Sequence, residues 1–304
     1  MPDFSSLILM LMLICTGFVL SRVKLLRREQ TSALPGLLLN MAYPALIIKS
    51  VTSVDVGRLA KESLIVAGVT AAVTLALFVL GTVLLKRYKD AKRRPLILFS
   101  MAVGNIAYVA LPVVRMLYGD VGVYYTILHS TTQDVMIWTL YYAYFVGGGT
   151  LKGFKPKKIL SPGFAAIVLG VLLAAFGIKP LGTVAMFLEA LAALTVPLAL
   201  VYIGAVLASY KKSSDWMPDR DTCLISVIKV LVLPAAVYGI MWLVPADAEL
   251  RLMMALFFAA PVTVLSTIWA KEYGFDYHFS VKALIFSTLL FLLAAGATII
   301  WMDR

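Results

Sequence analysis

The sequence has little charge and few cysteines. Asp, Glu, Lys and Arg make up 14% of its 304 residues, whereas 62% are hydrophobic. Soluble domains carry roughly a quarter charged residues, so the composition argues against a soluble globular domain. The only cysteines, Cys15 and Cys223, each lie inside an apolar run. Two scattered thiols indicate neither a disulfide framework nor a metal site.

Residues for catalysis and for nucleotide binding are scarce as well. The chain has two histidines and no paired acidic or nucleophile motif, so we assign no enzymatic chemistry to it. It also lacks a GxxxxGK(S/T) sequence, so ATP-driven transport would need a separate subunit. We therefore predict a protein that is not an enzyme and that has no cofactor and no metal.

Long apolar runs are what the chain has instead. Most approach the ~20 residues that cross a ~30 Å hydrocarbon core. In lipid such runs form helices, because the backbone must satisfy its own hydrogen bonds. We predict an all-α integral membrane protein of ten transmembrane helices with almost no extramembrane domain. The ten segments are 4–20, 34–51, 64–85, 95–117, 121–145, 162–176, 183–208, 223–244, 250–269 and 279–301.

Most of the basic residues lie in the loops after the odd-numbered segments. Short loops rich in Lys and Arg stay in the cytoplasm, so we expect both termini outside the cytoplasm. The formal net charge of +11 is then mainly a topology signal, and we predict no nucleic-acid partner. The basic residues of these loops are Arg22, Lys24, Arg27, Arg28, Lys86, Arg87, Lys89, Lys92, Arg93, Arg94, Lys152, Lys155, Lys157, Lys158, Lys211, Lys212, Arg220 and Lys271.

The two halves of the chain resemble each other at a nearly constant offset. The sequence YPALII at 43–48 aligns with VPLALV at 196–201, and YGDVGVYYTILHSTT from Tyr118 aligns with YGFDYHFSVKALIFST from Tyr273. Each half then has five segments, and because five is odd the second half enters the membrane from the opposite side. We predict an inverted repeat, a sign of secondary transporters. Its units are 1–147 and 162–304, joined by a short cytoplasmic linker at 148–161.

Five prolines fall in the middle part of the predicted helices; Pro234 in segment eight has no proline counterpart in the first half, and we interpret it as an ordinary kink. Pro44, Pro197 and Pro261 lie near the midpoints of segments two, seven and nine, and Pro112 lies just past the midpoint of segment four. A proline removes a backbone donor and leaves the carbonyl four residues earlier without its partner. Single prolines of this kind are often ordinary kinks. Their occurrence in both members of two repeat-related pairs favours functional breaks.

Several motifs occur in a distinctive order. They are LLLNMAYPALI in segment two, GN followed by LP and YG in segment four, VPLALVYIGAVL in segment seven, and AAP followed by AKEYG in segment nine. In this order they resemble the auxin efflux carrier family, which includes the plant PIN auxin exporters and bacterial permeases proposed for malate and malonate. The chain departs from these relatives at Ile106, Ala107 and Tyr108, where they often have threonine and glycine.

The resemblance implies a fold similar to those of bile-acid/sodium symporters and sodium/proton antiporters. In such proteins segments four and nine are broken and cross at the bilayer midplane, where substrate binds. It also implies a scaffold of segments one, two, six and seven, a moving part made of the other segments, and a homodimer. We expect Gly104 to end one half-helix in a left-handed conformation and Pro112 to lie in the first turn of the next. Half-helix N-termini favour anions.

The predicted substrate site lies at this crossing. Asn105 supplies an amide donor for a carboxylate, Tyr108 limits the size of the anion, and Asn40 closes the pocket from the scaffold. The full set of predicted substrate-binding residues is Asn40, Asn105, Ile106, Tyr108, Pro112, Pro261, Thr263, Ser266 and Thr267.

Segment five carries a polar face around Asp134. An ionisable residue near mid-membrane is usually functional, so we predict that Asp134 couples transport to a proton or a cation such as sodium. Gln133 and His129 are predicted to assist it, as is Lys282, because similar broken-helix antiporters pair a carboxylate in segment five with a lysine in segment ten. The structural alternative is that Asp134 is the ion-pair partner of Lys229 or Lys282 inside the bundle.

These observations predict a secondary active transporter of a small organic anion, a carboxylate, that works by elevator-type alternating access. The compact length suggests a bacterial inner membrane. The alternatives are an ion or solute channel, and a sodium- or proton-coupled symporter or antiporter for a different solute. An inverted repeat with opposed broken helices favours the carrier over the channel.

Overall fold

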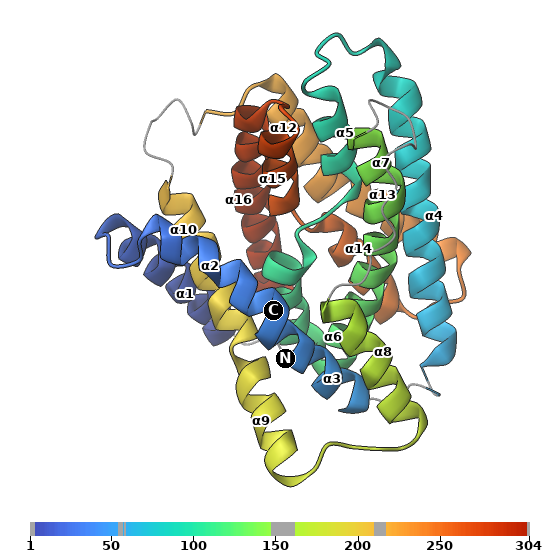
Figure 1. Cartoon of the computed structure of the whole chain (residues 1–304). Helices are drawn as coiled ribbons and strands as arrows, with labels where there is room; N and C mark the ends of the chain where they lie inside the picture. The colour runs from blue at the N-terminus through green and yellow to red at the C-terminus, as the bar shows by residue number, and fades with distance from the viewer. Residues whose placement is uncertain (1–3, 54–56, 58, 147–161, 210–216, 303–304) are drawn as a thin grey trace.

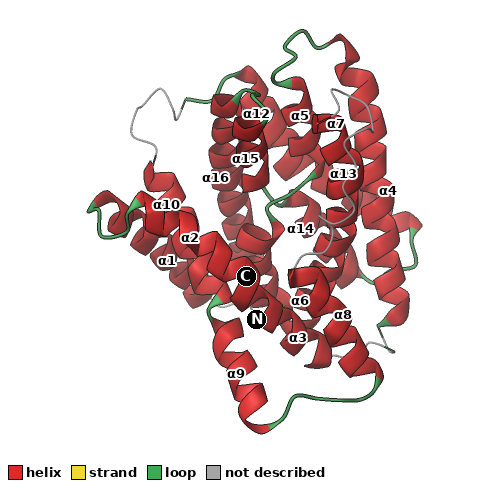
Figure 2. Cartoon of the chain, in the orientation of Figure 1, coloured by secondary structure: helices red, strands yellow, loops and turns green. Residues whose placement is uncertain are grey.

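The structure, a computed structural model, is built from helices (Figure 2). It describes residues 4–53, 57, 59–146, 162–209 and 217–302; the predicted linker 148–161 lies outside them. The described residues contain no strand, and their one isolated β-bridge joins Gly104 to Val262. The predicted all-helical class is therefore confirmed for this part of the chain.

The helices follow the predicted apolar segments, with interruptions inside several of them. The elements of the first half are α1 (Phe4–Arg22), α2 (Arg28–Leu37), η1 (Leu38–Ala42), α3 (Tyr43–Ser53), α4 (Ala60–Leu84), η2 (Leu85–Arg87), α5 (Arg94–Ala102), η3 (Ile106–Ala110), α6 (Leu111–Met136), η4 (Ile137–Tyr141) and α7 (Tyr142–Val146). Those of the second half are α8 (Pro162–Ala175), α9 (Gly182–Ala193), α10 (Thr195–Ser209), α12 (Arg220–Val227), η7 (Ile228–Val232), α13 (Leu233–Ile240), η8 (Met241–Leu243), α14 (Ala248–Ala259), α15 (Val264–Glu272) and α16 (Tyr277–Met302).

Six helices of the described chain are long and apolar enough to cross a membrane. Most of the remaining predicted segments form shorter helices, because breaks divide them or because their apolar part is short. The count of ten spans and the inverted repeat therefore stay predictions. The six helices are Glu29–Ser53, Ala60–Arg87, Ile106–Phe145, Gly182–Ala208, Arg220–Leu243 and Tyr277–Gly296.

Three internal prolines each follow a π-helical turn. The turns η1, η3 and η7 end two residues before Pro44, Pro112 and Pro234, and the residue just before each proline donates its N–H to the carbonyl five residues earlier. A π turn widens the helix by one residue per bond, which lets the chain continue past a ring that cannot donate. Pro112 lies in the first turn of α6, but because η3 precedes α6 it does not lie in the first turn of the half-helix that begins at Ile106.

The helices form two groups. The first helix group consists of α1, α2, η1, α3, α8, α9 and α10, and the second consists of α4 to α7 and α12 to α16. The most extensive helix pairing in the chain is α1 with α10, followed by α3 with α8, both inside the first group. In Figure 1, α1, α2 and α10 lie together on the left, and α4 and α13 lie on the right. The groups meet where α3 packs on α6 and where α10 packs on η3.

Two glycines let α1 and α10 touch backbone to backbone. A Cβ atom on Gly17 would overlap the carbonyl of Val201, and one on Gly204 would overlap the carbonyl of Ile14. Small residues are typical of membrane helix interfaces, where packing rather than the hydrophobic effect drives association. The contact between segments one and seven is thus set by side-chain size.

We predict that Gly204→Ala destabilises the protein by about 1–3 kcal/mol, because the added methyl group forces α1 and α10 apart. Gly68→Ala on α4 is the matched control, since nothing lies within 4 Å of its added Cβ. The control should be neutral or more stable by up to about 1 kcal/mol, as expected for Gly to Ala in a helix. Thermal unfolding of the purified proteins in detergent measures both, and equal melting temperatures would contradict the packing argument.

Candidate functional site

Two helices of the second group are interrupted at the same place. Helix α5 ends at Ala102 before η3 begins at Ile106, and α14 ends at Ala259 before α15 begins at Val264. We call residues 103–105 and 260–263 the crossing. There Gly104 pairs with Val262 in an antiparallel bridge, and the Asn105 N–H donates to the Pro261 carbonyl at 2.7 Å. The two breaks therefore satisfy part of each other's backbone.

Gly104 serves the crossing by its size. Its φ is not positive, unlike that of Gly119, Gly177, Gly182 and Gly274, so the predicted left-handed conformation is wrong. A Cβ on Gly104 would lie 2.7 Å from the Ala260 Cβ atom and 3.2 Å from its carbonyl oxygen. Only glycine lets the two broken chains approach this closely.

Side chains from two other helices complete the hydrogen bonding of the first break. Gln133 on α6 donates from Nε2 to the Ala102 carbonyl at 3.1 Å and accepts the Gly104 N–H on Oε1 at 3.5 Å. Lys229 on η7 donates from Nζ to the same Ala102 carbonyl at 3.3 Å and is fully buried. At the second break, the Ser287 hydroxyl on α16 accepts the Val262 N–H at 3.0 Å.

Each break leaves a helix N-terminus at the crossing. Asn105 precedes η3, and its side chain makes no capping hydrogen bond to that helix. Thr263 precedes α15 and accepts the Leu265 N–H on its hydroxyl at 3.3 Å. The first N–H groups of a helix have no carbonyl partner within it, and with the helix dipole they attract anions.

A cavity of about 390 Å³ opens beside both N-termini. The first helix group contributes Asn40, Tyr43 and Tyr202 to its wall, and most of the rest comes from the second group. Its polar side chains are amides, hydroxyls and phenols, and Asp134 is the one charged residue among the lining residues. The lining residues are Pro35, Asn40, Tyr43, Ile47, Val103, Gly104, Asn105, Ile106, Ala107, Tyr108, Ser130, Thr131, Gln133, Asp134, Ile137, Pro162, Tyr202, Thr263, Val264, Leu265 and Ile268.

The structure brings seven of the thirteen predicted site residues to this cavity and not the others. Those in its wall are Asn40, Asn105, Ile106, Tyr108, Thr263, Gln133 and Asp134. Those absent from it are Pro112, Pro261, Ser266, Thr267, His129 and Lys282. Pro261 still belongs to the crossing through its carbonyl.

The side chains of Ser266 and Thr267 form hydrogen bonds within the second helix group. The Ser266 hydroxyl lies 2.7 Å from that of Ser280 on α16, and the Thr267 hydroxyl donates to the Val264 carbonyl at 2.7 Å. Val264, Leu265 and Ile268 occupy the side of α15 that faces the cavity, and Ser266 and Thr267 lie on other sides of the same helix. Their predicted place in the pocket is wrong.

His129 is enclosed on the other side of α6. Its Nδ1 lies 2.8 Å from the Thr70 hydroxyl, and its ring packs against Phe257 and Phe258 at centroid distances of 5.1 and 5.0 Å. A fully buried ring in these surroundings is part of the packing between α4, α6 and α14. Its predicted position beside Asp134 in the pocket is therefore wrong.

Asp134 lies half-buried in the cavity wall. Among the described residues it has no Lys or Arg nitrogen within ion-pair distance, and the ion pairs there join Lys49 to Glu189 and Arg93 to aspartates. Neither Lys229 nor Lys282 is its ion-pair partner, so the structural alternative is wrong. Lys229 is occupied instead by the Ala102 carbonyl.

The sequence analysis missed the role of Lys229 and two tyrosines of the wall, Tyr43 and Tyr202. Lys229 is the lone basic residue of an apolar segment, which is itself a signal of function in a membrane helix. Tyr202 gave no such signal; its ring packs on Tyr108 at a centroid distance of 5.4 Å and joins α10 to η3. Within the described ranges, no group of three His, Cys, Asp or Glu side chains could hold a metal ion.

Comparison with known proteins identifies the family of the chain. The sequence model of a family described as membrane transport proteins matches residues 4–301. The chain belongs to the auxin efflux carrier family. It is also 24% identical over 303 residues to an uncharacterized transporter of Methanothermobacter thermautotrophicus, covering 97% of this chain and 96% of that relative. This member of the family is thus a multi-pass membrane transporter.

In this carrier we predict that Gln133→Leu lowers stability, because it leaves the Gly104 N–H without a partner. A buried polar group without its partner costs about 1–3 kcal/mol. Thr132→Val is the matched control, since Thr132 bonds only the Leu128 carbonyl of its own helix. Thermal unfolding in detergent should show a lower melting temperature for the Gln133 variant alone. Equal losses in the two variants would mean that Gln133 does not support the break.

Proposed function

We propose that the protein is a secondary transporter of a small organic anion and that the anion's carboxylate binds at the crossing. One observation carries the proposal: two half-helix N-termini, at Ile106 and Val264, open into the same cavity. Two partial positive charges and several free N–H groups at one point form a ready anion site. The amide of Asn105 adds a side-chain donor beside them.

The charge of the cavity favours coupling to a proton. No Lys or Arg lines it, and Asp134 is its one charged residue. Two like unit charges about 6 Å apart repel by about 3 kcal/mol at an effective dielectric constant of 20. A carboxylate therefore binds more easily when Asp134 carries a proton, and anion and proton then move together. A sodium ion bound at Asp134 would also neutralise its charge. Coupling to sodium is therefore the alternative version of the proposal.

The size of the cavity favours a compact substrate. A volume of about 390 Å³ lies near the lower end of the range for small-molecule pockets. Tyr108 narrows it from η3, and its ring contacts the tilted ring of Tyr202 from α10. We infer a smaller anion than the indole substrate of the plant exporters.

The division into two helix groups supports an elevator-type mechanism. The first helix group corresponds to the proposed scaffold and the second to the proposed moving part. The cavity wall has residues from both groups, so a rigid displacement of one group would carry the crossing past the wall formed by Asn40, Tyr43 and Tyr202. The proposal includes ten spans in an inverted repeat, both termini outside the cytoplasm, a homodimer formed through the scaffold, and a bacterial inner membrane.

We expect Asn105→Ala to weaken anion affinity about ten- to a hundredfold, since a lost hydrogen bond to a charged group costs about 1.5–3 kcal/mol. The probe is the carboxylate, from a panel of acetate, pyruvate, malonate and malate, that most raises the melting temperature of the parent protein. Saturable counterflow in proteoliposomes, which a channel does not show, then gives the affinity. Thr132→Val should match the parent. Affinity within twofold of the parent in folded Asn105→Ala protein would place the substrate elsewhere.

Asp134→Asn should insert and fold but lose the dependence of uptake on pH or on sodium, because the amide neither takes up a proton nor balances a cation. Asp120→Asn is the control: Asp120 also lies on α6 but does not line the cavity. Uptake is measured across imposed pH and sodium gradients. If both variants respond to these gradients like the parent, Asp134 has no part in coupling.

A further inference from the structure

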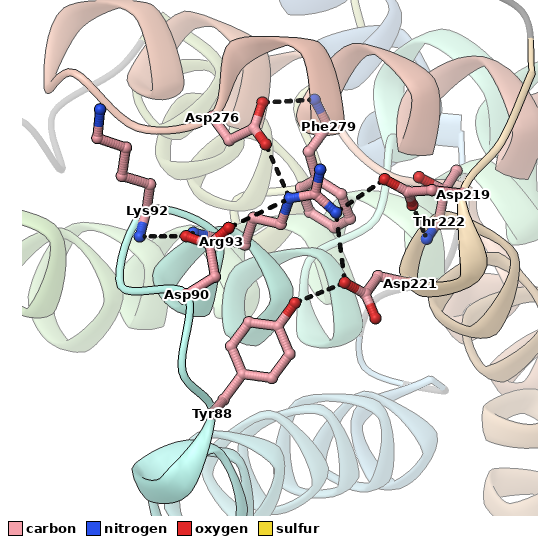
Figure 3. A network of polar contacts seen from close by, with 9 residues as sticks. All are labelled: Tyr88, Asp90, Lys92, Arg93, Asp219, Asp221, Thr222, Asp276 and Phe279. Atoms are coloured by element: carbon pink, nitrogen blue, oxygen red, sulfur yellow. Dashed lines mark hydrogen bonds and ion pairs between the residues drawn. The ribbon is translucent and has the colours of Figure 1, made fainter.

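One arginine joins three helices of the second helix group, α5, α12 and α16, at their N-termini. Arg93 donates from Nε to Asp276 at 2.8 Å and from Nη1 to Asp219 at 2.7 Å and Asp221 at 3.3 Å (Figure 3). Asp90 lies 3.5 Å from its Nε. We call these five residues, with Tyr88, the Arg93 cluster. The Tyr88 hydroxyl donates to Asp221 at 2.5 Å.

The aspartates of the cluster also begin two helices. Asp219 accepts the Thr222 N–H at 2.9 Å at the start of α12, and Asp276 accepts the Phe279 N–H at 3.0 Å at the start of α16. Arg93 itself is the residue before α5. The Asp276 N–H further donates to the Lys92 carbonyl at 3.3 Å. Three helix N-termini are therefore held by one guanidinium group.

Arg93 and the two aspartates that begin helices, Asp219 and Asp276, are ionised at neutral pH. Burial alone would raise the pKa of Asp219 and Asp276, but hydrogen bonds from backbone N–H groups and from Arg93 outweigh it and hold both pKa values below their usual range. Burial and the hydrogen bond to Asp221 raise the pKa of Tyr88 to about 12, so its hydroxyl keeps its proton. The contacts of Arg93 with Asp219 and Asp276 in Figure 3 are thus between full charges.

The same three helices lead from the cluster to the crossing. Helix α5 runs from Arg94 to Ala102, where the first break begins. Helix α16 carries Ser287, whose hydroxyl accepts the Val262 N–H, and η7 follows α12 and carries Lys229, which donates to the Ala102 carbonyl. Each path is nine to eleven residues long, about 15 Å at 1.5 Å per residue.

We propose that Arg93 is a positioning residue. It fixes the positions of α5, α12 and α16 relative to one another along their axes and thereby aligns the backbone of the crossing. Helices of this length transmit an axial shift along themselves, and N–H···O bonds tolerate only a few tenths of an ångström around 2.9 Å. A slip of one helix by 1 Å at the cluster would separate groups at the crossing that now bond. For binding, this inference rests on the proposed function; for the geometry of the crossing it does not.

Arginine is needed here for its shape. The planar guanidinium binds separate carboxylates from Nε and Nη1 at fixed angles, whereas a lysine ammonium is a point charge on a flexible chain. The Arg93 guanidinium also lies over the Phe279 ring, 5.1 Å from its centroid. Arg93→Lys thus keeps the charge and loses the geometry.

Hydrogen–deuterium exchange of the full-length protein in detergent tests the proposal without any ligand. In Arg93→Lys and Arg93→Met, peptides containing Asn105 and Val262 should exchange at least tenfold faster than in the parent, because their N–H bonds at the crossing open more often. Peptides of α1 and α10 should be unchanged. Arg87→Lys is the matched control in the same loop. Unchanged exchange at the crossing, or equal acceleration along the whole chain, would overturn the proposal.

A milder variant keeps the test decisive if Arg93→Met does not insert. Tyr88→Phe removes one contact to Asp221 and leaves Arg93 in place, so exchange at the crossing should rise about threefold and less than in Arg93→Lys. If Tyr88→Phe raised it as much as Arg93→Lys does, the cluster would act as a whole and Arg93 would have no special position.

Ligand binding then separates this inference from the proposed function. The carboxylate of the same panel that most stabilises the parent should bind Arg93→Lys about tenfold more weakly and Arg87→Lys equally well. If it binds Arg93→Lys as tightly as the parent, positioning by Arg93 is overturned while the anion site stands. If no carboxylate of the panel binds the parent, the proposed function fails, and exchange at the crossing still decides the role of Arg93.

Discussion

Peptide groups at the two helix breaks are the constraint around which this part of the protein is organised. Inside a membrane there is no water to bond an interrupted backbone, and each unpaired N–H or C=O costs several kcal/mol. The breaks at 103–105 and 260–263 lower this cost by hydrogen-bonding to each other, through the Asn105–Pro261 bond and the Gly104–Val262 bridge. Gly104 makes the approach possible because it has no side chain.

The other backbone N–H and C=O groups at the breaks are bonded by polar side chains inside the apolar bundle. Gln133 and Lys229 share the Ala102 carbonyl, and Ser287 accepts the Val262 N–H. Lys229 is absent from the residues that line the cavity, so its contact with the Ala102 carbonyl supports the backbone of the break. The cavity itself keeps free helix N-termini and a single carboxylate, Asp134. The polar residues thus divide into those that hold the backbone and those that face a ligand.

Packing between helices follows a different rule in each helix group. The first group relies on close contact, with α1 and α10 meeting at Gly17 and Gly204. The second group is joined by polar contacts at two levels, the crossing and the Arg93 cluster, with aromatic packing such as Phe99 on Trp269 between them. Polar contacts thus join the second group near the N-termini of α5, α12 and α16 and again at the crossing.

The sequence by itself determined the helical class, the positions of the apolar segments, the interruptions near Gly104 and Pro261, and the family. Those features depend on local composition and on which residues disrupt a helix, so they can be read along the chain. Only the tertiary structure decided which polar residues meet. Ser266 and His129 lie close in sequence to residues of the cavity wall but bond to other helices, and Thr267 bonds to its own helix. Tyr202 and Lys229, in contrast, reach the region from distant segments. Helix rotation and the contacts between helices set those directions, and neither is encoded in the spacing of one segment.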